Sequence, residues 1–185
     1  MGQSFWSRGP SLSTKFTAAD FPTLQPKSSA EDDYASILQA TIELTQLLHN
    51  VHDILYTSKS RTLEIMFMGD YSRYLDDFLK ALAAWNLAWG PLDVSPKLKC
   101  ALRLMYEYLC LYVNAFSLQA VISRSSDSQR RDDIEAQSLF PGGVMASPDG
   151  RFIFEAIRSA KVILKLFPEM DAVTNFRYLP SRFYL

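Results

Sequence analysis

Two histidines three residues apart are the first side chains in this sequence that could do chemistry. His49 and His52 lie in a segment of helical periodicity, with Asp53 beside the second, and side chains three apart on a helix share a face. Two imidazoles and a carboxylate could begin a metal site. The chain has no other histidine and the pair borders an apolar stripe, so we expect partly buried, hydrogen-bonded histidines and no bound metal.

The two cysteines do not suggest a catalytic or a structural pair. Cys100 and Cys110 are ten residues apart on one predicted helix, which separates them by about 15 Å at the rise of an α-helix. That separation is too large for a disulfide. Neither cysteine is tied by spacing to a histidine that could activate it. We expect both to be small buried side chains of a reduced, intracellular protein.

No pattern of catalytic residues is found. Asp76 and Asp77 are adjacent, and neighbouring side chains on a helix diverge by about 100°, so they cannot work as an acid and base pair. Pro141-Gly142-Gly143 lacks the lysine and the strand that a phosphate-binding loop requires, and the GxSxG and GxGxxG patterns are absent. The sequence therefore predicts a protein that is not an enzyme.

A group of aromatic and amide side chains could contact a ligand or a partner, because tyrosine and tryptophan carry a polar tip on an apolar body. The candidates are Tyr71, Tyr74, Trp85, Tyr106 and Asn114. Core packing is the alternative, and it is favoured because aromatic stripes at helical spacing are common in helix cores.

Composition and charge bound the class of protein. The chain has 185 residues, of which 48% are hydrophobic and 21% are charged, as expected for one globular domain. Its 19 basic and 20 acidic residues give a net charge of -1, so no general basic field favours DNA. We expect no direct contact with nucleic acid by this chain.

Apolar periodicity predicts an all-α fold. A first helix is expected over about residues 30–56, with Ser29 as its N-cap, and a second over about 61–89, which Gly69-Asp70 breaks or caps midway and Gly90-Pro91 ends. No segment alternates with the period of a strand. The fold is predicted to be a helical bundle or helical array, as part of a larger all-α domain.

The third predicted helix is the most apolar. It begins at Pro96 behind the cap Ser95 and runs to about residue 123. A membrane span is the alternative, but Arg103 and Glu107 lie inside the segment, and one unpaired charge at the bilayer centre costs roughly 2.5–3.5 kcal/mol. We therefore expect no membrane association. A last helix is expected to start at about Ser147-Pro148 and to end at Pro168.

These elements divide the chain into four parts. The predicted parts are an extended N-terminal arm at 1–28, a main helical region at 29–122, a polar linker or loop at 123–149, and a C-terminal helix with a truncated apolar tail at 150–185. The tail ends in FRYLPSRFYL, and such an apolar terminus is unusual for a free domain.

Two long segments resemble a known family. They are LLHNVHDILYTSKSRTLEIMFMGDYSRYLDDFLKALAAWNLAWG at 47–90 and SPKLKCALRLMYEYLCLYVNAFSLQAVISR at 95–124. Together they are similar to the C-terminal part of the regulatory, or middle homology, region of fungal zinc-cluster transcription factors. The likeness centres on the motif at 74–78, on Trp85, and on the helix at 104–116. The family's six-cysteine DNA-binding module is absent from this chain, so the resemblance implies no zinc or other cofactor here.

The resemblance implies a regulatory and interaction module of a fungal transcription regulator, located in the nucleus. It would control activation through helix packing with other parts of the same regulator, with the transcription machinery or with a small-molecule effector, and a homodimer is compatible with this role. The alternative is a stand-alone small helical ligand-binding protein or enzyme that uses His49, His52 and the tyrosine cluster.

Overall fold

The computed structural model describes residues 17–28, 31–131, 140, 143–144 and 147–169. Within these residues every regular element is a helix, which confirms the predicted all-α class. The α-helices are α1 (Tyr34–Leu55), α2 (Lys59–Met68), α3 (Tyr71–Trp89), α4 (Pro96–Arg131) and α5 (Gly150–Leu166). Short 3-10 turns are η1 (Ala18–Asp20), η2 (Pro22–Leu24) and η4 (Phe167–Glu169).

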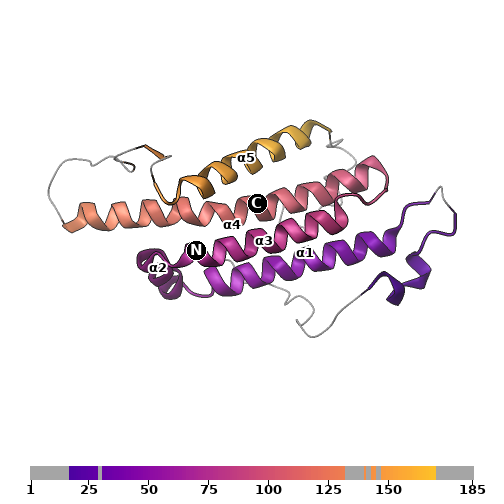
Figure 1. Ribbon diagram of the computed structural model, residues 1–185, viewed down its shortest axis with the longest axis horizontal. Coiled ribbons are helices and arrows are strands. Elements are labelled where there is room, and N and C mark those ends of the chain that lie inside the picture. Colours follow the sequence, from indigo (N-terminus) through magenta and orange to yellow (C-terminus); the bar gives the residue numbers. More distant parts are fainter. Residues whose placement is uncertain (1–16, 29–30, 132–139, 141–142, 145–146, 170–185) are drawn as a thin grey trace.

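The long helices lie side by side and alternate in direction (Figure 1). α4 lies in the middle, with α5 on one side of it and α3 and then α1 on the other. The short helix α2 packs at the end where α1 leads into α3, and α4 contacts each of the other α-helices. The structure is thus an antiparallel array organised around α4.

The main core fills the space between α1, α3 and α4. Leu55, Leu82 and Phe116 are almost completely buried there. The Trp85 indole donates a hydrogen bond to the carbonyl of Ala40 at 3.0 Å, which ties α3 to α1. From α5, Phe152 joins this cluster. Most of the apolar packing is therefore made by the first four α-helices.

The start of α1 differs from the sequence prediction. The helix begins at Tyr34 rather than near residue 30, and its N-cap is Asp33, whose carboxylate accepts from the Ser36 amide at 3.0 Å. Hydrogen bonds to Ser36 hold the pKa of Asp33 below its ordinary value. The predicted cap Ser29 lies outside the described residues. Glu31, Asp32 and Asp33 are consecutive, and each could cap a helix. The prediction placed all three inside the first turn, whereas the last of them is the N-cap.

Both glycines mark helix boundaries as predicted, but only Gly69 takes the left-handed conformation expected of such a residue, since Gly90 is right-handed with φ -57°. Gly69 has φ 78° and separates α2 from α3, so the segment at 61–89 is two helices. α3 then ends at Trp89, directly before Gly90-Pro91. α4 begins at Pro96, as expected from Ser95-Pro96.

The boundary between the third helix and the predicted linker lies later in the structure than in the prediction. α4 continues past residue 123 to Arg131, and in this serine-rich end the Ser126 hydroxyl donates to the Ile122 carbonyl of the preceding turn at 2.9 Å. A polar composition was interpreted as a loop, although polar residues can extend a helix beyond its packed stripe. α5 begins at Gly150, slightly after the predicted start, and ends at Leu166 before the turn η4.

The two predicted terminal segments are described only in part. Of the predicted N-terminal arm, residues 17–28 form η1 and η2, and the Ala18 amide donates to the Gln39 side chain of α1 at 2.7 Å. Residues 1–16 of that arm and the tail at 170–185 lie outside the described residues. None of the helices in the described part of the chain has the length and hydropathy needed to cross a membrane.

Gly69 gives a direct test of the α2–α3 junction. Its φ of 78° is strained for residues with a side chain, and no atom lies within 4 Å of the position that a Cβ would take, so the effect of a substitution comes from the backbone alone. We expect Gly69→Ala to lower the free energy of unfolding by about 1 kcal/mol. Gly69→Asn should cost less, because asparagine tolerates this conformation. Urea denaturation measures both, and equal stability of all three proteins would contradict the assignment.

Candidate functional site

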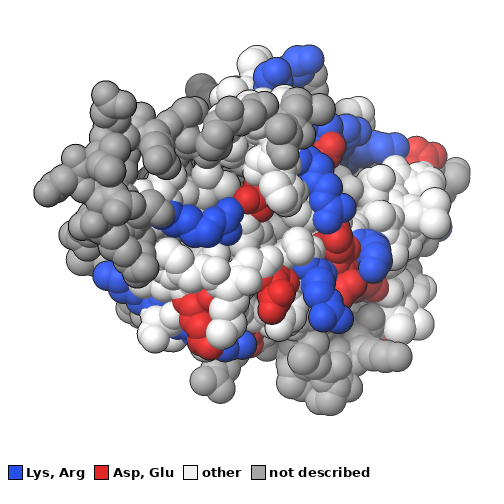
Figure 2. All heavy atoms as spheres, turned by 60° about the vertical axis from the view of Figure 1, so that its left-hand side comes forward, with Lys and Arg blue, Asp and Glu red and all other residues white. Residues whose placement is uncertain are grey.

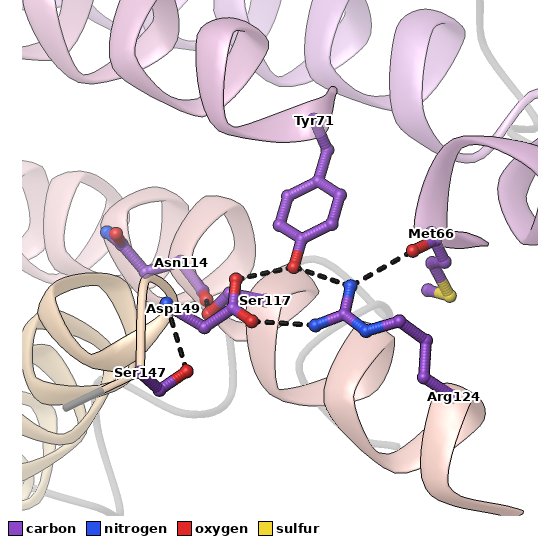
Figure 3. Close-up of polar contacts among 7 residues, drawn as sticks. All are labelled: Met66, Tyr71, Asn114, Ser117, Arg124, Ser147 and Asp149. Atoms are coloured by element: carbon purple, nitrogen blue, oxygen red, sulfur yellow. Dashed lines mark hydrogen bonds and ion pairs between the residues drawn. The ribbon is translucent and has the colours of Figure 1, made fainter. Parts of the chain in front are cut away.

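A buried polar network joins the ends of several helices, and we name Tyr71, Arg124 and Asp149 the latch. The Tyr71 hydroxyl donates a short hydrogen bond to Asp149 Oδ1, and Arg124 Nη2 pairs with Asp149 Oδ2 at 2.7 Å. Arg124 Nη1 donates to the Tyr71 oxygen at 2.9 Å and to the Met66 carbonyl at 3.0 Å. Figure 3 shows Tyr71 and Arg124 converging on the Asp149 carboxylate. The latch therefore connects α2, α3, α4 and the start of α5.

Local structure places each member of the latch. The turn at Gly69 makes Tyr71 the first residue of α3. Asp149 is the residue before α5, and its amide donates to the Ser147 hydroxyl at 3.2 Å. Arg124 reaches the site only because α4 continues beyond residue 123.

The protonation states of the latch are consistent with these bonds. Burial and the hydrogen bond to Asp149 raise the pKa of Tyr71 to about 12, so its hydroxyl is neutral and able to donate. Burial by itself would lower the pKa of Arg124, but Tyr71 and Asp149 outweigh it, so the pKa of Arg124 is raised. The guanidinium also lies over the Tyr71 ring, with its carbon 5.6 Å from the centroid. The Arg124 cation, the neutral Tyr71 phenol and the Asp149 carboxylate thus supply one another's hydrogen-bond and charge partners.

The face of α4 toward α5 includes three buried polar side chains, those of Glu107, Asn114 and Ser117. Its residues follow a three and four spacing that places them on one side of the helix: Glu107, Cys110, Asn114, Ser117 and Val121. All five are buried, and Glu107 lies 3.5 Å from Arg158 of α5. Figure 3 shows Asn114 and Ser117 on α4 beside the start of α5. The opposite face of α4 carries the apolar core residues.

Glu107 is the buried charge in this contact. Its side chain is 2% exposed and lies between Arg103 at 3.6 Å and Arg158 at 3.5 Å. Its Oε2 atom has no hydrogen bond, so the pairing with Arg158 is electrostatic. Both arginines are about half exposed and keep contact with water. A buried carboxylate held in this way contributes little net stability, since its desolvation offsets the attraction.

The five candidate contact residues do not form one site. Tyr71 belongs to the latch, and Asn114 is buried on the polar face of α4, where its amide donates to the Cys110 carbonyl at 2.8 Å. Trp85 and Tyr106 stack with ring centroids 5.6 Å apart. Tyr74 is 39% exposed on α3. Most of the predicted ligand-contact set therefore packs helices together.

The histidines lie as the simpler interpretation predicted, partly buried on α1. His49 Nε2 is 3.2 Å from Asp53 Oδ2, and His52 Nδ1 is 3.9 Å from Asp53 Oδ1. His52 stacks on Tyr56, which contacts Tyr112 of α4 at 4.8 Å between ring centroids. In the described ranges no three His, Cys, Asp or Glu side chains are arranged to hold a metal ion.

The cysteines differ in burial. Cys110 is buried and Cys100 is partly exposed. Burial raises the pKa of the Cys110 thiol to about 11, so it is protonated near neutral pH and a poor nucleophile. This state is consistent with a packing role for Cys110.

A hollow of about 450 Å³ lies between η2 and the start of α1, and it is lined by Thr23, Leu24, Gln25, Lys27, Glu31, Asp32 and Tyr34. None of the five candidate contact residues lines it. On the face in Figure 2, basic and acidic side chains lie next to one another in mixed groups. Uncharged surface separates these groups from one another.

Sequence reasoning missed two of the three latch residues. Arg124 and Asp149 fell within the predicted linker at 123–149 and were treated as solvated. Pro148-Asp149-Gly150 directly before an apolar helical pattern is a helix-start signal, and it could have marked Asp149. No local signal indicates that Arg124, 25 residues earlier, pairs with it.

Comparisons with known proteins add no assignment. No family model matches the sequence, and searches of curated proteins and of solved structures likewise found no match.

The latch predicts a large cost for removing its cation. Arg124→Ala leaves the Asp149 carboxylate, whose side chain is 10% exposed, without its charge partner, so we expect a loss of about 2–4 kcal/mol in the free energy of unfolding. Tyr71→Phe should cost about 1 kcal/mol, and the double variant should cost less than the sum. The matched control is Arg61→Ala, which breaks an exposed pair with Glu64 and should cost about 0.5 kcal/mol or less. Equal losses for Arg124→Ala and Arg61→Ala would contradict the latch.

One buried and three partly buried tyrosines predict a loss of stability in alkali. Burial raises the pKa of Tyr71 and Tyr112 to about 12, and raises those of Tyr56 and Tyr106 further. The unfolded chain releases these protons near pH 10, so their stabilising contribution is complete below about pH 10 and is lost as the pH rises toward about 12. Denaturant unfolding at several pH values between about 10 and 12 measures how steeply the free energy of unfolding falls with pH. Tyr71→Phe should flatten it, whereas Tyr34→Phe, at a half-exposed position, should not.

Proposed function

We propose that this chain is a regulatory interaction module of a fungal transcription regulator, which acts in the nucleus by helix packing and without catalysis. The observation that carries the proposal is the environment of α5. This helix rests on the polar face of α4 and exposes apolar side chains on its other side, including Phe154, Ile157 and Leu164. Such a helix is suited to exchange contacts with a partner.

Ion pairs add to the apolar packing of Phe152, Ile153 and Ala156 that attaches α5. Arg124 binds Asp149 at its start, Arg151 binds Asp76 of α3 at 2.7 Å, and Arg158 lies beside Glu107. Polar and ionic contacts depend on geometry more than apolar contacts do, so a small shift of α5 weakens several of them together. These features support a module with a docked and an undocked position of α5, whose populations a partner or a small-molecule effector could shift.

The class of regulator comes from the resemblance of residues 47–90 and 95–124. In that setting the partners are other parts of the same regulator, the transcription machinery, or a second copy of the chain. DNA contact and zinc would belong to a separate six-cysteine module. The alternative that uses His49 and His52 gains no specific support, since both imidazoles pack beside Asp53 and the aromatic cluster of α1 and α4.

A reporter assay tests the proposal. The full chain is placed between a heterologous DNA-binding module and an activation segment in yeast, and reporter output is compared with that of the same fusion without the chain. We expect the chain to change output by several-fold, and Arg124→Ala, which loosens α5, to reverse most of that change. Arg61→Ala, matched in charge and remote from α5, should behave like the unaltered chain. An output that is the same with and without the chain, at equal protein levels, would reject the proposal.

A further inference from the structure

The outer side of α5 carries an apolar stripe between exposed cations. Phe154 and Ile157 are each 44% exposed and Leu164 is 69% exposed, and their spacing of three and seven residues places them along one side of the helix. Lys161 and Lys165 lie on the same exposed side. Neither lysine forms an ion pair with another described residue. We name these five residues the α5 surface.

The neighbouring end of α4 adds further positive charge. Because α4 and α5 run in opposite directions, the start of α4 lies beside the end of α5, away from α2 (Figure 1). That start carries the exposed side chains of Lys97, Lys99 and Arg103. The start of α4 and the end of α5, which includes the exposed Leu164, therefore carry several cations in a chain whose net charge is -1.

The carboxylates on these two helix segments pair with arginines, Arg103 of the cluster among them, and not with Lys161 or Lys165. Within 96–113 and 150–166 the sequence has two acidic residues, Glu107 and Glu155. Glu107 is buried between arginines, and Glu155 accepts from Arg158 at 2.7 Å. Lys161 and Lys165 thus remain available to a negatively charged partner.

We propose that the α5 surface binds an amphipathic helix that presents an apolar stripe flanked by acidic side chains. This proposal rests on the proposed function and names the chemistry of the partner. Phe154 and Leu164 are ten residues apart, or about 15 Å along the helix, which is about the length of three turns of a partner helix. Opposite charge fixes the orientation and speeds the encounter.

The shape of the surface favours a helical peptide over a lipid bilayer. Helices that lie in a membrane interface bury a wide apolar face. The wide apolar side of α5, with Phe152, Ile153 and Ala156, is already buried in the protein, and a narrow stripe remains outside. A single partner helix covers a stripe of that width.

The test titrates the full chain with a fluorescent, end-capped peptide of about three to four helical turns that carries leucine on one stripe and glutamate beside it. One matched peptide replaces every glutamate by lysine, and a second replaces every leucine by glutamine. Fluorescence anisotropy measures the binding. We expect the peptide with leucine and glutamate to bind at least tenfold more tightly than either control peptide, and its affinity to fall as the salt concentration is raised.

Matched protein variants locate the binding. Lys161→Glu with Lys165→Glu should weaken binding about tenfold, whereas Lys59→Glu with Lys80→Glu makes the same charge change on α2 and α3 and should have little effect. Leu164→Gln should also weaken binding, and its control is Leu87→Gln, at an 81% exposed position on α3. Circular dichroism checks that each variant keeps its helical content. If Lys161→Glu with Lys165→Glu loses helical content, Lys161→Gln with Lys165→Gln takes its place.

Several outcomes would overturn the proposal. These are equal binding of the lysine peptide, equal effects of the two charge-reversed variants, or no binding of any peptide by a folded chain. Binding of phosphatidylserine vesicles or of a DNA duplex, lost in Lys161→Glu with Lys165→Glu while no peptide binds, would assign the surface to those ligands instead. Self-association lost in Leu164→Gln, again without peptide binding, would assign it to a second copy. If the reporter responds to the chain but no peptide binds, the regulatory function stands and this partner assignment fails.

Discussion

The structure depends on α4, which has to satisfy two different neighbours at once. One side carries apolar residues such as Leu109 and Phe116 and packs against α1 and α3. The other side carries Glu107, Asn114 and Ser117 and meets α5. Apolar burial is non-directional and tolerates small shifts, whereas buried polar groups require particular partners. The same helix therefore builds a robust core on one side and a geometry-dependent contact on the other.

The latch lies where these two kinds of packing meet. Tyr71 contacts the core through Phe116, with ring centroids 5.5 Å apart, and its hydroxyl binds Asp149 at the start of α5. Arg124 adds the Met66 carbonyl at the end of α2. Helix ends leave backbone groups without partners inside the helix, and here an arginine satisfies one such carbonyl while it neutralises a buried carboxylate. The position of α5 is thereby coupled to the junction between α2 and α3.

Burial keeps several chemistry-bearing side chains neutral in the described part of the chain. Tyr56 and the Cys110 thiol, whose pKa values are raised by burial, are held neutral within helix contacts. Neutral buried phenols and thiols support packing and hydrogen bonding rather than nucleophilic chemistry. In the described part of the chain, Tyr71, Trp85 and Tyr106 join helices to one another.

The sequence by itself determined the helical class and several helix ends, because these depend on local physics: apolar residues at helical spacing, the left-handed Gly69, and the Gly90-Pro91 and Ser95-Pro96 boundaries. It also indicated histidines packed beside an apolar stripe. Local signals were insufficient where composition was ambiguous, as at Asp33 and in the serine-rich end of α4. Tertiary structure alone decided that Tyr71, Arg124 and Asp149 meet and that Trp85 stacks on Tyr106. Those pairings join residues that are distant in the chain. They form only once α4 packs against α1 and α3 on one side and against α5 on the other.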